Sequence, residues 1–192
     1  MRTGRITASR CADFMTNGKG EMFGETAKTY AKELVCDRLG IERDEVTTWQ
    51  MEWGIEHEPD ARQIYENSRQ IKVHLPGFIE FGTNAGCTPD GVIMKDETPI
   101  GLLEIKCPQW KAYIDYLITK QPPKDYWQQM QFQMMVTGAL WCDWMIYHPN
   151  FPDHLKAKVF RIERDQDYID LIESRLQPFE ELIQLYIKAL SE

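Results

Sequence analysis

The chain has 192 residues, of which 43% are apolar and 11% aromatic, a composition that predicts one folded domain over 1–192. No apolar run approaches the roughly 18 residues of a membrane span, and no signal peptide is visible, so we expect a cytoplasmic protein with no membrane association. The five cysteines are scattered and show no Cys-x-x-Cys spacing, a pattern that excludes a disulfide framework and a zinc or iron–sulfur site.

The net charge of −8 at first argues against a nucleic-acid partner, because phosphate binding usually leaves a basic surface. The charges are unevenly distributed, however. Residues 1–32 carry six Lys/Arg against three Asp/Glu, and residues 42–66 carry two Arg against eight acids. A basic stretch beside an acidic one suits a phosphate pocket next to a metal site, although the charges taken alone favour simple solvated faces.

The first part of the chain is predicted to be helical. A short helix is expected from Ile6 to Phe14, with Thr7 or Ser9 as its N-cap, followed by a loop at 17–20. Apolar residues at helical spacing predict a helix over 25–39, closed by Gly40. A further helix is predicted from Thr47 or Thr48 to Ser68, with a kink or break at Pro59.

The middle and the end of the chain predict strands and two more helices. Short β-rich segments are expected at 78–85, 91–95, 100–106, 141–147 and 156–162, with helices at 125–138 and 165–190. In the last helix, Ile169, Ile172, Leu176, Phe179, Ile183, Tyr186 and Leu190 are expected to face inward. The order predicts an α/β fold of the mixed α+β kind, with a mixed central sheet flanked by helices.

The pattern Pro89-Asp90, thirteen residues, then Glu104-Ile105-Lys106 is the strongest chemical signal. Side chains alternate along a strand, so Glu104 and Lys106 share one face while Ile105 points into the core. If 92–95 and 100–106 form a hairpin, Asp90 lies near them. Two carboxylates and an ammonium would then converge. The carboxylates suit a hard divalent cation such as Mg²⁺, which can polarise a scissile phosphate. The ammonium of Lys106 could orient the attacking water or stabilise the charge that develops on the phosphate.

The alternative is an exposed strand with a salt bridge, worth about 0–1 kcal/mol. Leu102-Leu103 and Ile105 make this strand apolar, and an acid and a lysine in a buried strand need a reason. We therefore favour the functional interpretation for Asp90, Glu104 and Lys106.

Two neighbouring segments leave their candidates open. Glu56, Glu58 and Asp60 each offer a third carboxylate, and spacing does not choose among them. His57 falls on the apolar stripe of the same predicted helix, which favours a packed histidine over a ligand. One glutamine of the segment 128–133 could reach the site, but spacing does not say which.

Six motifs in order resemble the lambda-exonuclease (YqaJ-type) branch of the PD-(D/E)xK nucleases. They are Arg2-Thr3-Gly4-Arg5-Ile6-Thr7-Ala8-Ser9, Trp53-Gly54-x-x-x-Glu58-x-Asp60-Ala61-Arg62, Cys87-Thr88-Pro89-Asp90-Gly91, Leu103-Glu104-Ile105-Lys106-Cys107-Pro108, Gln129-x-Gln131 with Met134 and Val136-Thr137, and Tyr147-x-Pro149. The resemblance spans residues 2 to about 149 and implies a restriction-endonuclease-like core of a mixed sheet flanked by helices.

The resemblance also implies an activity and roles for individual residues. The activity is 5′-to-3′ digestion of one strand of linear double-stranded DNA. Glu58, Asp90, Glu104 and the Ile105 carbonyl would bind Mg²⁺, as two ions with Mn²⁺ as a substitute. Lys106 would act on the attacking water, with support from Gln131. The residues matching a pocket for a 5′-terminal phosphate are Arg2, Thr7, Ser9 and Thr88.

The partners implied by the resemblance are double-stranded DNA ends, two further copies of the chain in a ring-shaped trimer, and a single-strand annealing protein. A trimer with a basic central channel would reconcile the acidic net charge with DNA binding. The alternatives are another PD-(D/E)xK endonuclease or repair nuclease, and a non-catalytic module that binds DNA ends. Intact Glu58, Asp90, Glu104 and Lys106 argue against the non-catalytic module.

Overall fold

The computed structural model describes residues 2–43 and 48–191. Its elements in chain order are β1 (Ile6–Thr7), a 3-10 turn η1 (Ala8–Arg10), α1 (Cys11–Phe14), α2 (Glu25–Arg38), α3 (Trp49–Arg69), β2 (Ile79–Phe81), β3 (Ala85–Cys87), β4 (Gly91–Lys95), β5 (Thr98–Lys106), α4 (Trp110–Thr119), α5 (Lys124–Thr137), β6 (Trp141–Tyr147), α6 (Asp153–Lys156), β7 (Ala157–Glu163) and α7 (Gln166–Ala189). Across these residues we find no helix with both the length and the apolar character needed to cross a bilayer.

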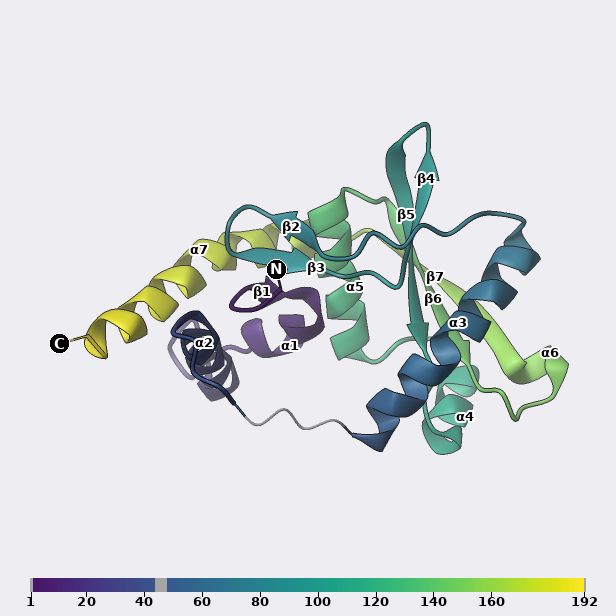
Figure 1. Ribbon diagram of the computed structural model, residues 1–192, viewed down its shortest axis with the longest axis horizontal. Coiled ribbons are helices and arrows are strands. Elements are labelled where there is room, and N and C mark those ends of the chain that lie inside the picture. Colours follow the sequence, from purple (N-terminus) through teal and green to yellow (C-terminus); the bar gives the residue numbers. More distant parts are fainter. Residues whose placement is uncertain (1, 44–47, 192) are drawn as a thin grey trace.

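The strands form two mixed sheets, and the predicted mixed α+β class is confirmed. The smaller sheet has the order β1-β3-β2, with β1 parallel to β3, and the larger has the order β4-β5-β6-β7. Only β5 and β6 are parallel within the larger sheet, and the crossover between them contains α4 and α5. Helix α5 lies between the two sheets, so it can contact both (Figure 1).

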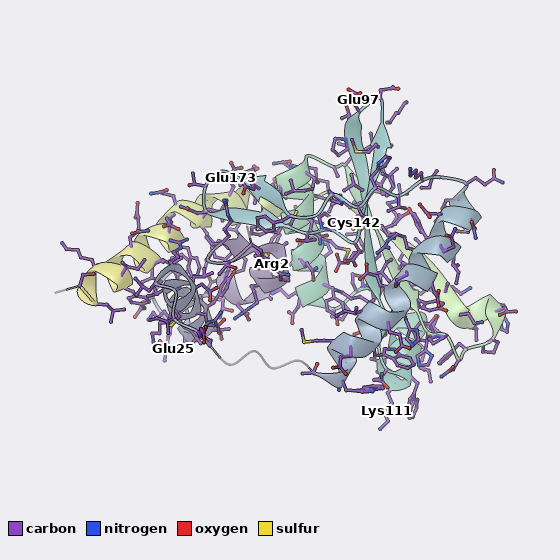
Figure 2. The ribbon with its side chains drawn as sticks, in the orientation of Figure 1. Arg2, Glu25, Glu97, Lys111, Cys142 and Glu173 are labelled. Atoms are coloured by element: carbon purple, nitrogen blue, oxygen red, sulfur yellow. The ribbon has the colours of Figure 1, made fainter. Side chains whose placement is uncertain are left out.

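The predicted hairpin before the crossover is present. Strands β4 and β5 pair antiparallel from Lys95–Thr98 at the turn to Gly91–Leu103. The hairpin projects from the body of the molecule, and Glu97 is exposed at its tip (Figures 1 and 2). Because β4 begins at Gly91, Asp90 is left just beyond the last pair, beside the final residues of β5.

The core has two parts, one on each face of the larger sheet. On one face, α3 packs through Ala61 and Tyr65 against Leu103, Ile105 and Met145. The other part fills the space between the two sheets and the helices α1, α2, α5 and α7, and includes Leu102, Cys142 and Trp144. Cys142 is fully buried near the centre of the molecule (Figure 2). The end of β5 therefore lies between two packed layers.

Several local predictions differ from the structure. Helix α3 runs without a break through Pro59. Proline has no N–H to donate to the carbonyl of Ile55, but Ile55 lies on the exposed side of the helix, where water can bind that carbonyl. Its N-cap is Thr48, whose side chain accepts from the Met51 N–H; the alternative start at Thr47 lies outside the described residues. Leu190 follows the end of α7 and is exposed, not inward-facing.

The N-terminal segment also departs from one continuous helix. Ile6 and Thr7 form β1, and only then do η1 and α1 follow. Thr7 is the N-cap of η1 by its backbone, and its hydroxyl accepts no capping hydrogen bond from a backbone N–H of that turn. The sequence analysis assigned no structure to 110–123, where α4 forms around the buried Tyr113.

Candidate active site

Glu104 is the centre of a polar cluster at the end of β5. Its side chain is only 1% exposed, although a carboxylate is among the groups most costly to bury. Oε1 accepts from Lys106 Nζ at 2.6 Å and from Gln129 Nε2 at 2.7 Å, while Oε2 accepts from Gln133 Nε2 at 2.7 Å. Three donors therefore hold this carboxylate in one orientation.

Asp90 lies on the adjacent edge of the same strand. Its Oδ2 accepts from the Ile105 N–H at 2.7 Å, replacing the strand partner that β4 no longer supplies. In a strand the N–H and C=O of one residue point to the same edge, so the Ile105 carbonyl also lies on the Asp90 side. The hairpin thus brings Asp90 close to Glu104, as predicted from the strand pairing, and the Ile105 carbonyl that the resemblance implied lies on the same edge.

Burial and neighbouring charges shift the pKa values in this cluster. Burial, followed by the Glu104 carboxylate, raises the pKa of Asp90 well above its ordinary value. Burial alone would lower the pKa of Lys106, but the carboxylates of Glu104 and Asp90 outweigh it and raise that pKa, so the ammonium stays charged. The Lys106 Nζ also lies 4.6 Å from the centre of the Tyr126 ring.

Glu58 is the acid of α3 that reaches this cluster. It is partly buried, whereas Glu56 and Asp60 are exposed. Its carboxylate contributes to raising the pKa of Asp90. Burial, followed by the carboxylates of Glu58 and Asp90, raises the pKa of Cys107 to about 12. The carboxylate that the resemblance chose therefore lies close enough to Asp90 to affect its charge state.

His57 and Trp53 occupy the neighbouring part of α3. Their ring centroids are 4.1 Å apart in an edge-on arrangement, in keeping with a packed histidine. Neither Trp53 Nε1 nor His57 Nε2 has a hydrogen-bond partner in the described structure.

Gln131 is not part of the cluster, contrary to the role that the resemblance implied for it. Its Nε2 donates to the Glu163 carbonyl and its Oε1 accepts from the Asp165 N–H, both at 2.9 Å, so it fastens the β7–α7 junction. The reason is helical periodicity: residues four apart share a face, whereas residues two apart point in nearly opposite directions. Gln129 and Gln133 share the face toward Glu104, and this spacing was the signal that could have identified them.

The residues expected to bind a 5′-phosphate line one small cavity of about 30 Å³. Its polar lining includes Arg2, Thr7, Ser9, Thr88, Gln129 and Gln133. Arg2 Nη2 donates to Ser9 Oγ at 3.0 Å, and the Thr7 and Ser9 hydroxyl oxygens are 3.3 Å apart. Arg2 lies between the N-terminal elements and α5, as Figure 2 shows. Because Gln129 and Gln133 also donate to Glu104, these two side chains join the cavity to the carboxylate cluster.

The donor chemistry of the cluster fits a hard divalent cation, since it consists of carboxylate and carbonyl oxygens. Burial and the Glu104 carboxylate raise the pKa of Asp90. A cation bound here would relieve the repulsion between these two carboxylates. In the described ranges, however, no three His, Cys, Asp or Glu side chains are arranged to hold an ion as they stand. Each carboxylate is turned toward a donor of the protein itself.

Comparisons with known proteins identify similar structures and a matching family. A structure of the alkaline exonuclease LHK-Exo from Laribacter hongkongensis is 35% identical, with a TM-score of 0.88 over 99% of this chain and 93% of that one. A complex of LHK-Exo with dAMP is 36% identical, with a TM-score of 0.87 over 98% and 92% of the two chains.

A phage-related exonuclease from Haemophilus somnus 129PT shares the fold at 14% identity, with a TM-score of 0.77 over 97% of this chain and 96% of that one. No curated protein sequence matches the chain. The model of the YqaJ-like viral recombinase domain matches residues 1–140, which cover five of the six motifs in full. The chain therefore belongs to the YqaJ-like viral recombinase domain family.

Proposed function

We propose that the protein is a Mg²⁺-dependent exonuclease that degrades one strand of linear double-stranded DNA from 5′ to 3′. The products would be 5′-phosphorylated nucleotides and a 3′ single-stranded overhang for annealing-type recombination. The observation that carries the proposal is the cluster of Asp90, Glu104 and Lys106, joined through Gln129 to the cavity at Ser9. Membership of the family and the likeness to an alkaline exonuclease support it.

In this proposal Glu58, Asp90, Glu104 and the Ile105 carbonyl hold the metal. Bound Mg²⁺ would polarise the scissile phosphate and lower the pKa of the attacking water. The protein's own part is to keep two carboxylates ready in a buried place, which Gln129 and Gln133 do for Glu104. Fixed donors of this kind avoid reorganisation during the reaction.

Lys106 would stabilise negative charge that develops on the phosphate. Its raised pKa keeps the ammonium protonated in the metal-free protein, so it acts there as a charge and a donor and not as a base. Its position next to Glu104, at 2.6 Å, also allows it to orient a water held by that carboxylate.

The cavity near Arg2 and Ser9 supports the proposed 5′-to-3′ polarity of digestion. A guanidinium fork with hydroxyls suits a terminal phosphate monoester, which carries more charge than a diester. Gln129 and Gln133 line this cavity and also donate to Glu104, so a bound 5′ end would have its first phosphodiester close to the carboxylates. A 3′ end offers no such phosphate.

Digestion of linear duplexes tests the proposal. Duplexes labelled at either the 5′ or the 3′ end, with a 5′-phosphate or a 5′-hydroxyl, are incubated with and without Mg²⁺. We expect early release of the 5′ label, no digestion without metal, and slower digestion of hydroxyl ends. Equal rates on 5′-phosphorylated and 5′-hydroxyl ends would reject the phosphate pocket. Cleavage of closed circular DNA would indicate an endonuclease.

Variants of the cluster complete this test. Asp90→Ala is expected to abolish digestion while the protein stays folded, as judged by circular dichroism. Full activity of Asp90→Ala would refute the assigned site. Ser9→Ala is the matched variant of the cavity, and it should reduce the preference for phosphorylated ends without abolishing cleavage.

We extend the proposal to a homotrimer that acts on DNA ends together with an annealing protein in the cytoplasm. An apolar stripe on α4 supports self-association: Trp110, Ile114 and Ile118 follow one another at four-residue spacing and are 54%, 38% and 73% exposed. Sedimentation equilibrium should give three times the mass of 22.6 kDa. A monomer at micromolar concentration would reject the trimer.

A further inference from the structure

Arg62 forms a second connection between α3 and the carboxylate cluster. It lies one turn after Glu58, and its Nη2 donates to Glu58 Oε1. Its Nε donates to the backbone carbonyl of Asp90 at 3.2 Å. The two side chains of this ion pair are 16% and 33% exposed, so both are shielded from much of the solvent. One guanidinium therefore contacts two of the four residues proposed to hold metal.

The position of Arg62 accounts for the arrangement of the cluster. Glu58 and Asp90 lie close enough for the charge of Glu58 to raise the pKa of Asp90, after burial and Glu104. A positive group near them is therefore stabilising, and Arg62 supplies it at Glu58 as Lys106 does at Glu104. With both cations in contact, the carboxylates face protein donors instead of a common point, and no three of them stand ready for an ion in the described ranges.

We propose that Arg62 is an internal counter-ion that competes with the divalent cation for Glu58 and thereby sets the affinity of the site for metal. The inference rests on the metal-dependent function proposed above. Arg62 donates to Glu58 Oε1, so a metal that takes this same oxygen weakens the ion pair. The free energy of that pair is then subtracted from the free energy of metal binding.

The alternative is that Arg62 positions Glu58 for the metal. Pairs with the acid four residues before the base are favourable on any helix, so the contact by itself does not decide between the two roles. The two roles predict opposite signs. Loss of a competitor tightens metal binding, whereas loss of a positioning group weakens it.

Mg²⁺ binding without DNA distinguishes these roles. Isothermal titration calorimetry is carried out on the full chain, wild type, Arg62→Gln and Arg69→Gln. Arg69 lies two turns further along α3 and is exposed, so its loss removes the same charge from the same helix away from Glu58. We expect Arg62→Gln to bind about five-fold more tightly, the size expected for one partly shielded ion pair, and Arg69→Gln to bind as the wild type does.

Unchanged or weaker binding by Arg62→Gln would overturn the inference, as would equal tightening by Arg69→Gln. Absence of Mg²⁺ binding by the wild type would instead reject the proposed metal-dependent function itself. Arg62→Lys, which keeps the charge but loses the planar fork, is expected to lie between wild type and Arg62→Gln.

Thermal melting provides a second readout that does not depend on activity. In EDTA, Arg62→Gln should melt below the wild type because the Glu58 carboxylate loses its partner. In saturating Mg²⁺ this deficit should shrink, since the metal has already displaced Arg62 in the wild type. A deficit of equal size in both conditions would contradict the competition.

Discussion

The variants Gln131→Leu and Gln129→Leu test whether the two faces of α5 have different roles. Gln131 holds the junction of β7 and α7, whereas Gln129 holds the Glu104 carboxylate. Gln131 makes two part-buried hydrogen bonds of 2.9 Å to the backbone of Glu163 and Asp165, and Leu of similar size leaves both groups unpaired. At about 1 kcal/mol for each, the lower end of the range for unpaired groups, unfolding becomes easier by about 2 kcal/mol. For a chain of 192 residues this lowers the melting temperature by roughly 4–8 °C.

The same change at Gln129 should act on the reaction instead. It removes one of the three donors to the Glu104 carboxylate, and loss of such a supporting group typically costs about 10–100-fold in activity or metal affinity. The melting temperature reports the loss of stability. The exonuclease rate, measured well below the unfolding transition, reports the effect on the reaction. An inactive but stable Gln131→Leu, or a fully active Gln129→Leu, would refute the assignment of the faces.

Two further predictions concern buried charges. Burial and Glu104 raise the pKa of Asp90, so the fold favours its neutral form; this stability is complete below the ordinary pKa of 3.8 and is lost as the pH rises through the raised value. Asp90→Asn keeps an oxygen for the Ile105 N–H, and in EDTA it should melt above the wild type at pH 8 but not near pH 3; a lower melting temperature at pH 8 would contradict this. Arg175→Leu removes a guanidinium that is bonded to carbonyls of the α1–α2 loop, including that of Met22 at 2.8 Å, and should lower the free energy of unfolding by about 2–4 kcal/mol in urea, with new proteolytic cleavage in that loop. Wild-type stability and protease resistance would contradict the second prediction.

The carboxylate cluster was predictable because its geometry is local. Side-chain alternation in β5 fixes Glu104 and Lys106 on one face, and a four-residue turn brings Asp90 to the same end of the hairpin. The choice of Glu58 needed the family resemblance, because it depends on how α3 packs across the sheet. No local pattern contains that information.

Other features depend on contacts between distant segments. Strand β1 has only two residues and pairs with β3, so that Ile6 lies opposite Ala85; the division into two sheets could not be read from so short a strand. Arg62 stood in a matched motif, but its contact with Glu58 became visible only in the structure. Gln131 was misassigned by counting along a motif, where the helical period would have favoured Gln129 and Gln133.

Helix α7 is fastened to α2 and to the loop after α1, and this has a consequence for biosynthesis. Arg38 on α2 donates to both carboxylate oxygens of Glu180 on α7, 142 residues later, and Arg175 on α7 binds Asn17, 158 residues earlier. A ribosome therefore releases the N-terminal segment, with Arg2, Thr7 and Ser9, long before the helix that fastens it has been made. The cavity lined by Arg2, Thr7 and Ser9 should therefore gain its full support only once α7 has been synthesised, after the strands that carry Glu104 and flank Asp90.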